Sequence, residues 1–181
     1  MDARTESEPT PAKNRATVER KSERELVVTR TINGPARLVF EAWTKPELFK
    51  QWWVPKSFPM SLLACEMDVR VGGKYHLVFG QGGAKAFEVY GKYIEVTPHS
   101  RLVWTNEEGA DGGTVTTVTF EEKGGKTLLV MHDLYPSKEA LDAAIASGSI
   151  AYSVEDARGL SETLDQLDEL VVTLGAGLGR S

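Results

Sequence analysis

Histidines are the side chains in this sequence best suited to moving a proton or binding a metal, and the chain has three of them. One of them, His132, falls in a segment with the pattern of a β-strand, and alternation places it on the inward face with Leu128, Val130 and Leu134. From there its ring could hydrogen-bond to a carbonyl or hydroxyl group of a ligand. The plainer interpretation is a core histidine whose bonds are satisfied within the protein.

The other candidates for chemistry do not form a recognisable site. His76 alternates with apolar neighbours and is expected to face solvent, His99 lies in a predicted turn, and Cys65 is the only thiol. These residues are not at metal-ligand spacing, so the sequence predicts no metal. Nothing is placed to activate a serine or the cysteine, and the glycine clusters lack the strand-to-helix context of a nucleotide loop. We therefore assign no catalytic residue and no cofactor.

Composition narrows the class of partner. The net charge of −5 argues against nucleic acid, because no phosphate backbone would be attracted to the surface as a whole. No apolar run approaches the about 20 residues of a membrane-spanning helix, and the first residues lack the apolar core of a secretory signal. We therefore expect a cytoplasmic protein without membrane insertion, either a monomer or a homodimer.

The chain divides into one domain and two tails. Residues 1–22 are rich in charged and small polar side chains with hardly any aliphatic ones, so they are predicted to be a disordered tail. Residues 23–174 form the domain. Residues 175–181 are rich in glycine and lack periodicity, so they are predicted to be a flexible C-terminal tail.

Inside the domain the periodicity of apolar residues changes in order along the chain. Residues 25–32 alternate like a strand, and two short helices follow at 35–43 and 46–53, the second opened by a capping box from Thr44 to Glu47. Further strands are then predicted at 62–67, 74–79, 86–96, 101–106, 114–122 and 127–134. Their short connections favour antiparallel pairing of neighbours, which is a meander.

Two helices complete the chain, a modest one at 137–146, capped by Ser137, and a long one at 154–174. The long helix has an apolar stripe opposite an acidic side that we expect to be solvated. The stripe consists of Leu160, Leu164, Leu167, Leu170, Val171 and Leu174. Such a stripe needs an apolar partner, and the concave side of the sheet is the large one on offer. The sequence predicts an α+β fold, with a curved antiparallel sheet of about six to seven strands wrapped around a long C-terminal helix.

This order of elements resembles the helix-grip fold of the START-like or SRPBCC superfamily. The local sequence over residues 24–174 is similar to the family named for the activator of heat-shock-protein-90 ATPase, in its bacterial single-domain form. The similar segments are PARLVFEAWT at 35–44, WWVP at 52–55, GGKY at 72–75, GKYIEVTP at 91–98, RLVWT at 101–105 and KTLLV at 126–130. Leu160 stands where that family usually has a tryptophan. The sequence shows no counterpart of the separate domain with which the eukaryotic co-chaperone contacts its chaperone, so the resemblance does not imply that role.

The resemblance and the predicted curvature together suggest an apolar cavity between the sheet and the last helix, where a small hydrophobic or amphipathic molecule would bind. We expect Trp52 near its entrance, with an indole N–H available to the ligand. The expected lining residues are Tyr75, Leu77, Phe79, Phe87, Val118, Phe120, Val130, His132, Leu160 and Leu164. The bland alternative is that these side chains simply fill a solid core.

Two other functions remain open from the sequence. Some relatives in the superfamily are enzymes, so a polyketide cyclase-like reaction in the same cavity, with His132 handling a proton, is one alternative. The other is a chaperone ATPase accessory, linked to the stress response, which would need an exposed apolar patch.

Overall fold

The strands of this protein form one antiparallel sheet, with the last helix and the two short helices that follow the first long strand packed on one of its faces. A computed structural model describes residues 16–54, 56–57, 59–107, 113–146 and 158–179, with the side chains of the last helix described from Glu162 to Gly177. The elements are β1 (Thr17–Arg20), β2 (Glu25–Ile32), α2 (Ala36–Thr44), α3 (Pro46–Phe49), β3 (Ser61–Met67), β4 (Lys74–Gln81), β5 (Ala84–Thr97), β6 (Arg101–Asn106), β7 (Thr114–Lys123), β8 (Lys126–Leu134), α4 (Lys138–Ala146) and α5 (Arg158–Gly179).

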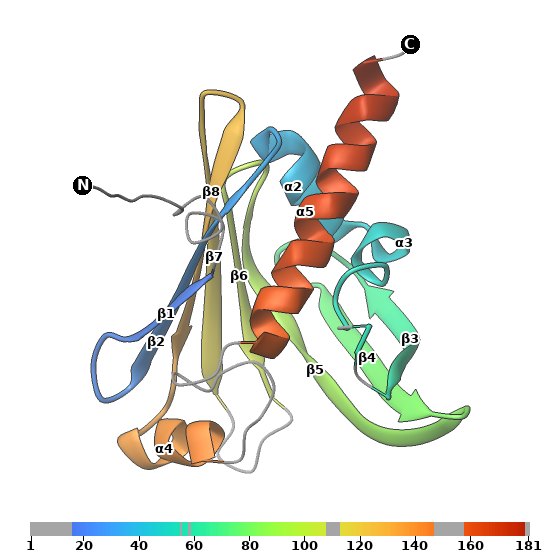
Figure 1. The fold of residues 1–181 in the computed structure, drawn as a ribbon. Helices are drawn as coiled ribbons and strands as arrows, with labels where there is room; N and C mark the ends of the chain where they lie inside the picture. Colours follow the sequence, from blue (N-terminus) through green and yellow to red (C-terminus); the bar gives the residue numbers. More distant parts are fainter. Residues whose placement is uncertain (1–15, 55, 58, 108–112, 147–157, 180–181) are drawn as a thin grey trace, which may run out of the picture.

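The sheet has eight strands in the order β1-β2-β8-β7-β6-β5-β4-β3, one more than the upper number predicted. Figure 1 shows α5 crossing this sheet on the same side as α2 and α3. The predicted α+β class and helix-grip arrangement are confirmed. The meander from β3 to β8 closes on β2, so the first long strand lies beside the last one.

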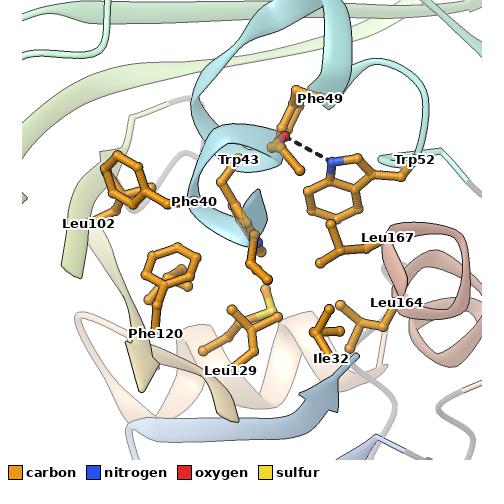
Figure 2. Packing of buried hydrophobic residues seen from close by; sticks show 14 of the residues in the cluster. Ile32, Phe40, Trp43, Phe49, Trp52, Leu102, Phe120, Leu129, Leu164 and Leu167 are labelled. Atoms are coloured by element: carbon orange, nitrogen blue, oxygen red, sulfur yellow. Dashed lines mark hydrogen bonds between the residues drawn. The ribbon is translucent and has the colours of Figure 1, made fainter. Parts of the chain in front are cut away.

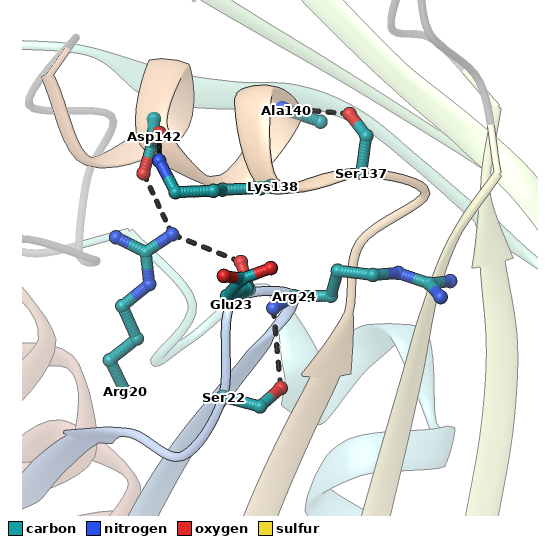
Figure 3. A network of polar contacts seen from close by, with 8 residues as sticks. All are labelled: Arg20, Ser22, Glu23, Arg24, Ser137, Lys138, Ala140 and Asp142. Carbon is teal, nitrogen blue, oxygen red and sulfur yellow. Dashed lines mark hydrogen bonds and ion pairs between the residues drawn. The ribbon is translucent and has the colours of Figure 1, made fainter.

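The extra strand lies in the segment predicted to be a disordered tail. Residues 17–20 pair with β2, Thr17 opposite Thr29, so that prediction is wrong for them, while residues 1–15 lie outside the described part. The Arg20 guanidinium forms a 2.7 Å ion pair with Asp142 of α4 and donates to the carbonyl of Glu23 (Figure 3). Thr-Val-Glu-Arg is too short and polar to predict as a strand; it becomes one because β2 offers an edge and α4 a carboxylate.

The short helices begin and end differently from the prediction. The first has Pro35 as its N-cap, and the carboxylate of Glu122 accepts a 2.9 Å hydrogen bond from the Ala36 N–H, which satisfies a free donor of the first turn. The expected capping box is wrong, because the Thr44 hydroxyl donates back to the carbonyl of Phe40 at 2.8 Å. The second helix spans only Pro46–Phe49, so Trp52 lies beyond it.

The facing of β8 is opposite to the prediction. Leu129 and Met131 are buried in the main core, whereas Val130 and His132 lie on the outer face and are only partly covered. The sequence around them is apolar on both faces, so alternation alone was not decisive. The pairing of β8 with β7 decides which face points inward, because Leu129 lies opposite the buried Phe120 and Met131 opposite the buried Val118.

The last helix is longer than predicted. It continues to Gly179, so the prediction of a flexible segment from residue 175 is wrong for residues 175–179, and residues 180–181 lie outside the described part. Leu164, Leu167 and Val171 are fully buried, as the apolar stripe predicted. At the top of the helix, a Cβ added to Gly34 would collide with a methyl group of Val171. Glycine at that turn therefore allows α5 to pack closely on the start of α2.

The main core lies between α2, α3, α5 and the inner face of the sheet (Figure 2). Its centre is aromatic: the Trp43 ring lies 4.9 Å from that of Trp52, 5.8 Å from that of Trp104 and 6.3 Å from that of Phe120, between ring centroids. A second, smaller cluster joins Leu26 of β2 to Tyr135 and Leu141, under α4.

Candidate functional site

The inner face of the sheet collects most of the residues predicted to line a cavity. The structure brings these into the main core: Trp52, Tyr75, Leu77, Phe79, Val118, Phe120 and Leu164. Phe87 shares their face, stacked on Phe79 at 4.7 Å between ring centroids, but it is 38% exposed. The side chain of Leu160 lies outside the described residues. The inward orientation predicted for Val130 and His132 is wrong, as the register of β8 requires.

The tryptophan whose indole N–H could bond a ligand is Trp43, not Trp52 as the sequence suggested. The Trp52 indole N–H donates to the carbonyl of Ala42 at 3.0 Å and the side chain is fully buried, so this donor is already used. Trp43 is 2% exposed, and its Nε1 has no hydrogen-bond partner among the described residues. Figure 2 shows its ring extending from α2 toward Phe120, Leu129 and Leu164. A donor without an acceptor thus lies in the middle of the apolar core.

Arg30 is a second buried donor that the sequence analysis missed. It lies on β2 between the core residues Val28 and Ile32, and its side chain is 4% exposed. Its Nη1 lies 2.8 Å from Oδ1 of Asp165 on α5, which is an ion-pair distance, yet within the described part of the chain neither Nη1 nor Nε has an acceptor in hydrogen-bonding direction. Val28 and Arg30 are two residues apart on the same strand, so alternation places both side chains on the inward face. That alternation was the sequence signal from which the burial of Arg30 could have been predicted.

A chain of polar groups crosses the inner face at the end of the sheet farthest from α2. The Asn106 amide donates to the Thr116 hydroxyl at 2.9 Å, and that hydroxyl donates to the Asp133 carboxylate at 2.6 Å. The Tyr75 hydroxyl donates to the carbonyl of Thr105 at 2.7 Å and lies 3.3 Å from Oδ1 of Asn106. A side chain at Gly91 would collide with both Tyr75 and Thr105, so glycine there permits this contact. Buried polar groups of this kind can orient the polar end of a ligand.

The acidic side of α5 is less solvated than predicted. Gln166, which the helical pattern placed on the polar side, is 8% exposed and is bonded to the loop after α3. Its amide N–H groups donate to the carbonyls of Trp52 at 3.0 Å and Val54 at 2.9 Å, and its oxygen accepts from the Lys56 N–H at 2.8 Å. Asp168 accepts a 2.7 Å bond from the Asn33 N–H. These side chains dock α5 against the loops that flank the core.

Titratable groups of the described part do not form an activated catalytic set. Burial raises the pKa of the Cys65 thiol, which keeps it neutral and a poor nucleophile, and burial likewise raises the pKa of Tyr93. His132 lies 2.7 Å from the Glu25 carboxylate on the outer face, and this bond, followed by that from Ser22, lowers the pKa of Glu25. Among the described residues no group of three His, Cys, Asp or Glu side chains is placed to hold a metal.

The family model for Activator of Hsp90 ATPase homolog 1-like protein matches residues 33–172, from the turn after β2 to the last turns of α5. The chain belongs to this family. The family membership predicted from the sequence is confirmed, and the family includes proteins that bind ligands in a cavity of this fold.

Solved structures support the same fold for this Activator of Hsp90 ATPase homolog 1-like chain. A protein of Nitrosomonas europaea is 26% identical with a TM-score of 0.71, covering 86% of this chain and 98% of its own. A protein of Rhodobacter sphaeroides is 23% identical with a TM-score of 0.75, covering 88% and 99%. A protein of Mycobacterium smegmatis is 21% identical with a TM-score of 0.70, covering 86% and 96%. No curated protein matches the chain. In the described part, no helix is both long and apolar enough to span a bilayer.

Proposed function

We propose that this protein binds a small hydrophobic or amphipathic molecule between the inner face of its sheet and α5. The observation that carries the proposal is the indole N–H of Trp43, which is buried among aromatic and aliphatic side chains and has no acceptor in the part of the chain that the structure describes. Leaving such a donor unpaired costs about 1–3 kcal/mol, and most buried polar groups in proteins are paired. An oxygen atom of a bound ligand would supply the missing acceptor.

The surroundings of Trp43 support a ligand of mixed character. The neighbouring rings of Trp104 and Phe120 present apolar surface that would pack against a hydrocarbon or aromatic body. The polar chain from Asn106 through Thr116 to Asp133 lies on the same face of the sheet and offers hydrogen bonds to a polar end. Of the lining residues predicted from sequence, we retain Trp52, Tyr75, Leu77, Phe79, Phe87, Val118, Phe120, Leu160 and Leu164.

Native mass spectrometry of the full chain, as purified, tests the proposal by detecting a retained small molecule. A thermal-shift screen of amphipathic metabolites extends the test, because a ligand at a hundred times its dissociation constant stabilises a fold by about 2.7 kcal/mol. Trp43→Phe, which removes the donor, should weaken retention of the ligand. Trp52→Phe should weaken it less, because the donor that it removes is already bonded to the carbonyl of Ala42. An empty spectrum together with a screen that shifts no melting temperature would reject ligand binding.

The cyclase-like alternative, in the form that the sequence suggested, is contradicted by the position of His132. It required His132 inside the cavity with a polar partner in reach, whereas His132 is bonded to Glu25 on the outer face. No observation on the described residues favours the chaperone-accessory role over ligand binding. We further propose a cytoplasmic monomer or homodimer, in keeping with the negative charge and the single cysteine of the sequence.

A further inference from the structure

We infer that the ligand is an acid, held by the guanidinium of Arg30; this inference rests on the proposed ligand-binding function. Among the described residues, the buried side chains with N–H groups that lack an aligned acceptor are those of Arg30 and Trp43, and both carry only hydrogen-bond donors. A ligand that completes the interior must therefore bring acceptor oxygens. A carboxylate attached to an apolar body meets that requirement and also matches the positive charge of Arg30.

The position of Arg30 supports this reading. Its neighbours along the inner face of β2 are Val28 and Ile32, and its cross-strand partner is Leu129, all members of the main core. A guanidinium surrounded by such side chains is stabilised by an anion that accepts from its N–H groups, and arginine binds carboxylates with particular geometric fit. Its described partner, Asp165, lies 2.8 Å from Nη1 but is not aligned with an N–H of that atom, and Nε also lacks an aligned acceptor among the described residues.

Arg30 and Asp165 differ in how far each depends on the other. The Asp165 side chain is 58% exposed, so water can solvate it without Arg30, whereas the Arg30 side chain is 4% exposed and its guanidinium depends on a protein or ligand partner. A carboxylate entering beside Arg30 would compete with Asp165 for the same positive charge. Removing the negative charge of Asp165 should consequently strengthen the binding of an acid, while a purely structural ion pair would make both partners equally necessary for the fold.

The test uses three probes with the same hydrocarbon chain, decanoate, decanol and decylamine, titrated into the full chain by calorimetry. We expect the wild-type protein to bind decanoate at least about tenfold more tightly than decanol, and decylamine most weakly, given the strength of hydrogen bonds to charged groups. In Arg30→Met the preference for decanoate should vanish while decanol binding persists. Arg30→Lys should keep part of the preference. Asp165→Asn should tighten decanoate binding several-fold and leave decanol unchanged.

Two controls separate the possible failures. Arg37→Met makes the same change at a half-exposed arginine of α2 and should alter none of the affinities. Melting temperatures of all variants report whether Arg30 and Asp165 simply hold α5 in place. Equal affinity for decanoate and decanol, or loss of both probes in Asp165→Asn, overturns the acid inference and leaves ligand binding standing. Failure of all three probes to bind, with no molecule retained in native mass spectrometry, overturns the proposed function with it.

Discussion

Trp43 and Trp52 have their rings 4.9 Å apart, yet of the two only Trp52 has an acceptor for its indole N–H among the described residues. Both side chains are almost fully buried, so neither donor reaches water. The pair is an internal comparison between a satisfied and an unsatisfied polar group in the same environment.

Replacing each tryptophan with phenylalanine should therefore have different effects on stability. Both changes remove a similar volume, but Trp52→Phe also leaves the Ala42 carbonyl without its donor, whereas Trp43→Phe removes an N–H that no described residue accepts from. We expect Trp52→Phe to lower the free energy of unfolding by about 1–3 kcal/mol more than Trp43→Phe. Urea unfolding of the ligand-free protein measures both. Equal losses would mean that the Trp43 donor is paired in solution.

Gly34 should tolerate no side chain while Val171 is in place. In Gly34→Ala the new methyl group would collide with Val171, so we expect a loss of about 1–3 kcal/mol of stability. The double variant with Val171→Ala should lose less than the two single changes added together, because Val171→Ala removes the methyl group that the new one would strike.

Gly175 of α5 is the matched control for that experiment. A Cβ there would meet Leu38 at an ordinary 3.7 Å, so Gly175→Ala should stabilise the helix by about 0.5–1 kcal/mol. Denaturant midpoints of the variants give the comparison. A destabilised Gly175→Ala, or a neutral Gly34→Ala, would contradict the packing of α5 described above.

We expect the hydrogen bonds of Gln166 to hold the loop after α3 in place. Gln166→Ala removes two donors and one acceptor, leaving the carbonyls of Trp52 and Val54 and the N–H of Lys56 unpaired by protein. We expect faster hydrogen exchange of the Lys56 amide and a stability loss of about 2 kcal/mol. Glu169→Ala, at an exposed position of the same helix, is the control and should change neither. Unchanged exchange at Lys56 would show that the loop is held by other contacts.

Glu25 and His132 should make stability depend on pH at acid values. The bond from His132 lowers the pKa of Glu25 in the folded state, so the carboxylate is more readily ionised there than in the unfolded chain. Its contribution is present above the unfolded pKa of about 4.3 and is lost as pH falls through the lower folded value.

Glu25→Gln is therefore expected to be less stable than wild type near pH 6 and to match it at the lowest pH at which both proteins remain folded. In a His132→Gln background the same change should have a smaller effect, because only the bond from Ser22 remains. Urea unfolding across the acid range measures the difference. A gap between Glu25→Gln and wild type that widens toward low pH would contradict the assigned sign.

Periodicity was informative wherever one face of an element is clearly apolar. The stripe of Leu164, Leu167 and Val171 and the alternation of Tyr75, Leu77 and Phe79 both predicted burial correctly. The same rule failed at β8, where consecutive apolar residues occupy both faces. It also failed at β1, whose four residues have no strong preference of their own and pair only because β2 and α4 are beside them.

By itself, the sequence determined the order of the elements from β2 to α5, the α+β class, the family and the apolar face of the last helix, because these depend on spacing between near neighbours in the chain. Only the tertiary structure decided that His132 faces outward, that Gln166 is buried, that the Trp43 N–H has no acceptor among the described residues and that Arg30 is buried beside a carboxylate not aligned with its N–H groups. Whether a polar atom finds a partner depends on residues distant in the chain that folding brings within about 3 Å, a distance that no local pattern encodes.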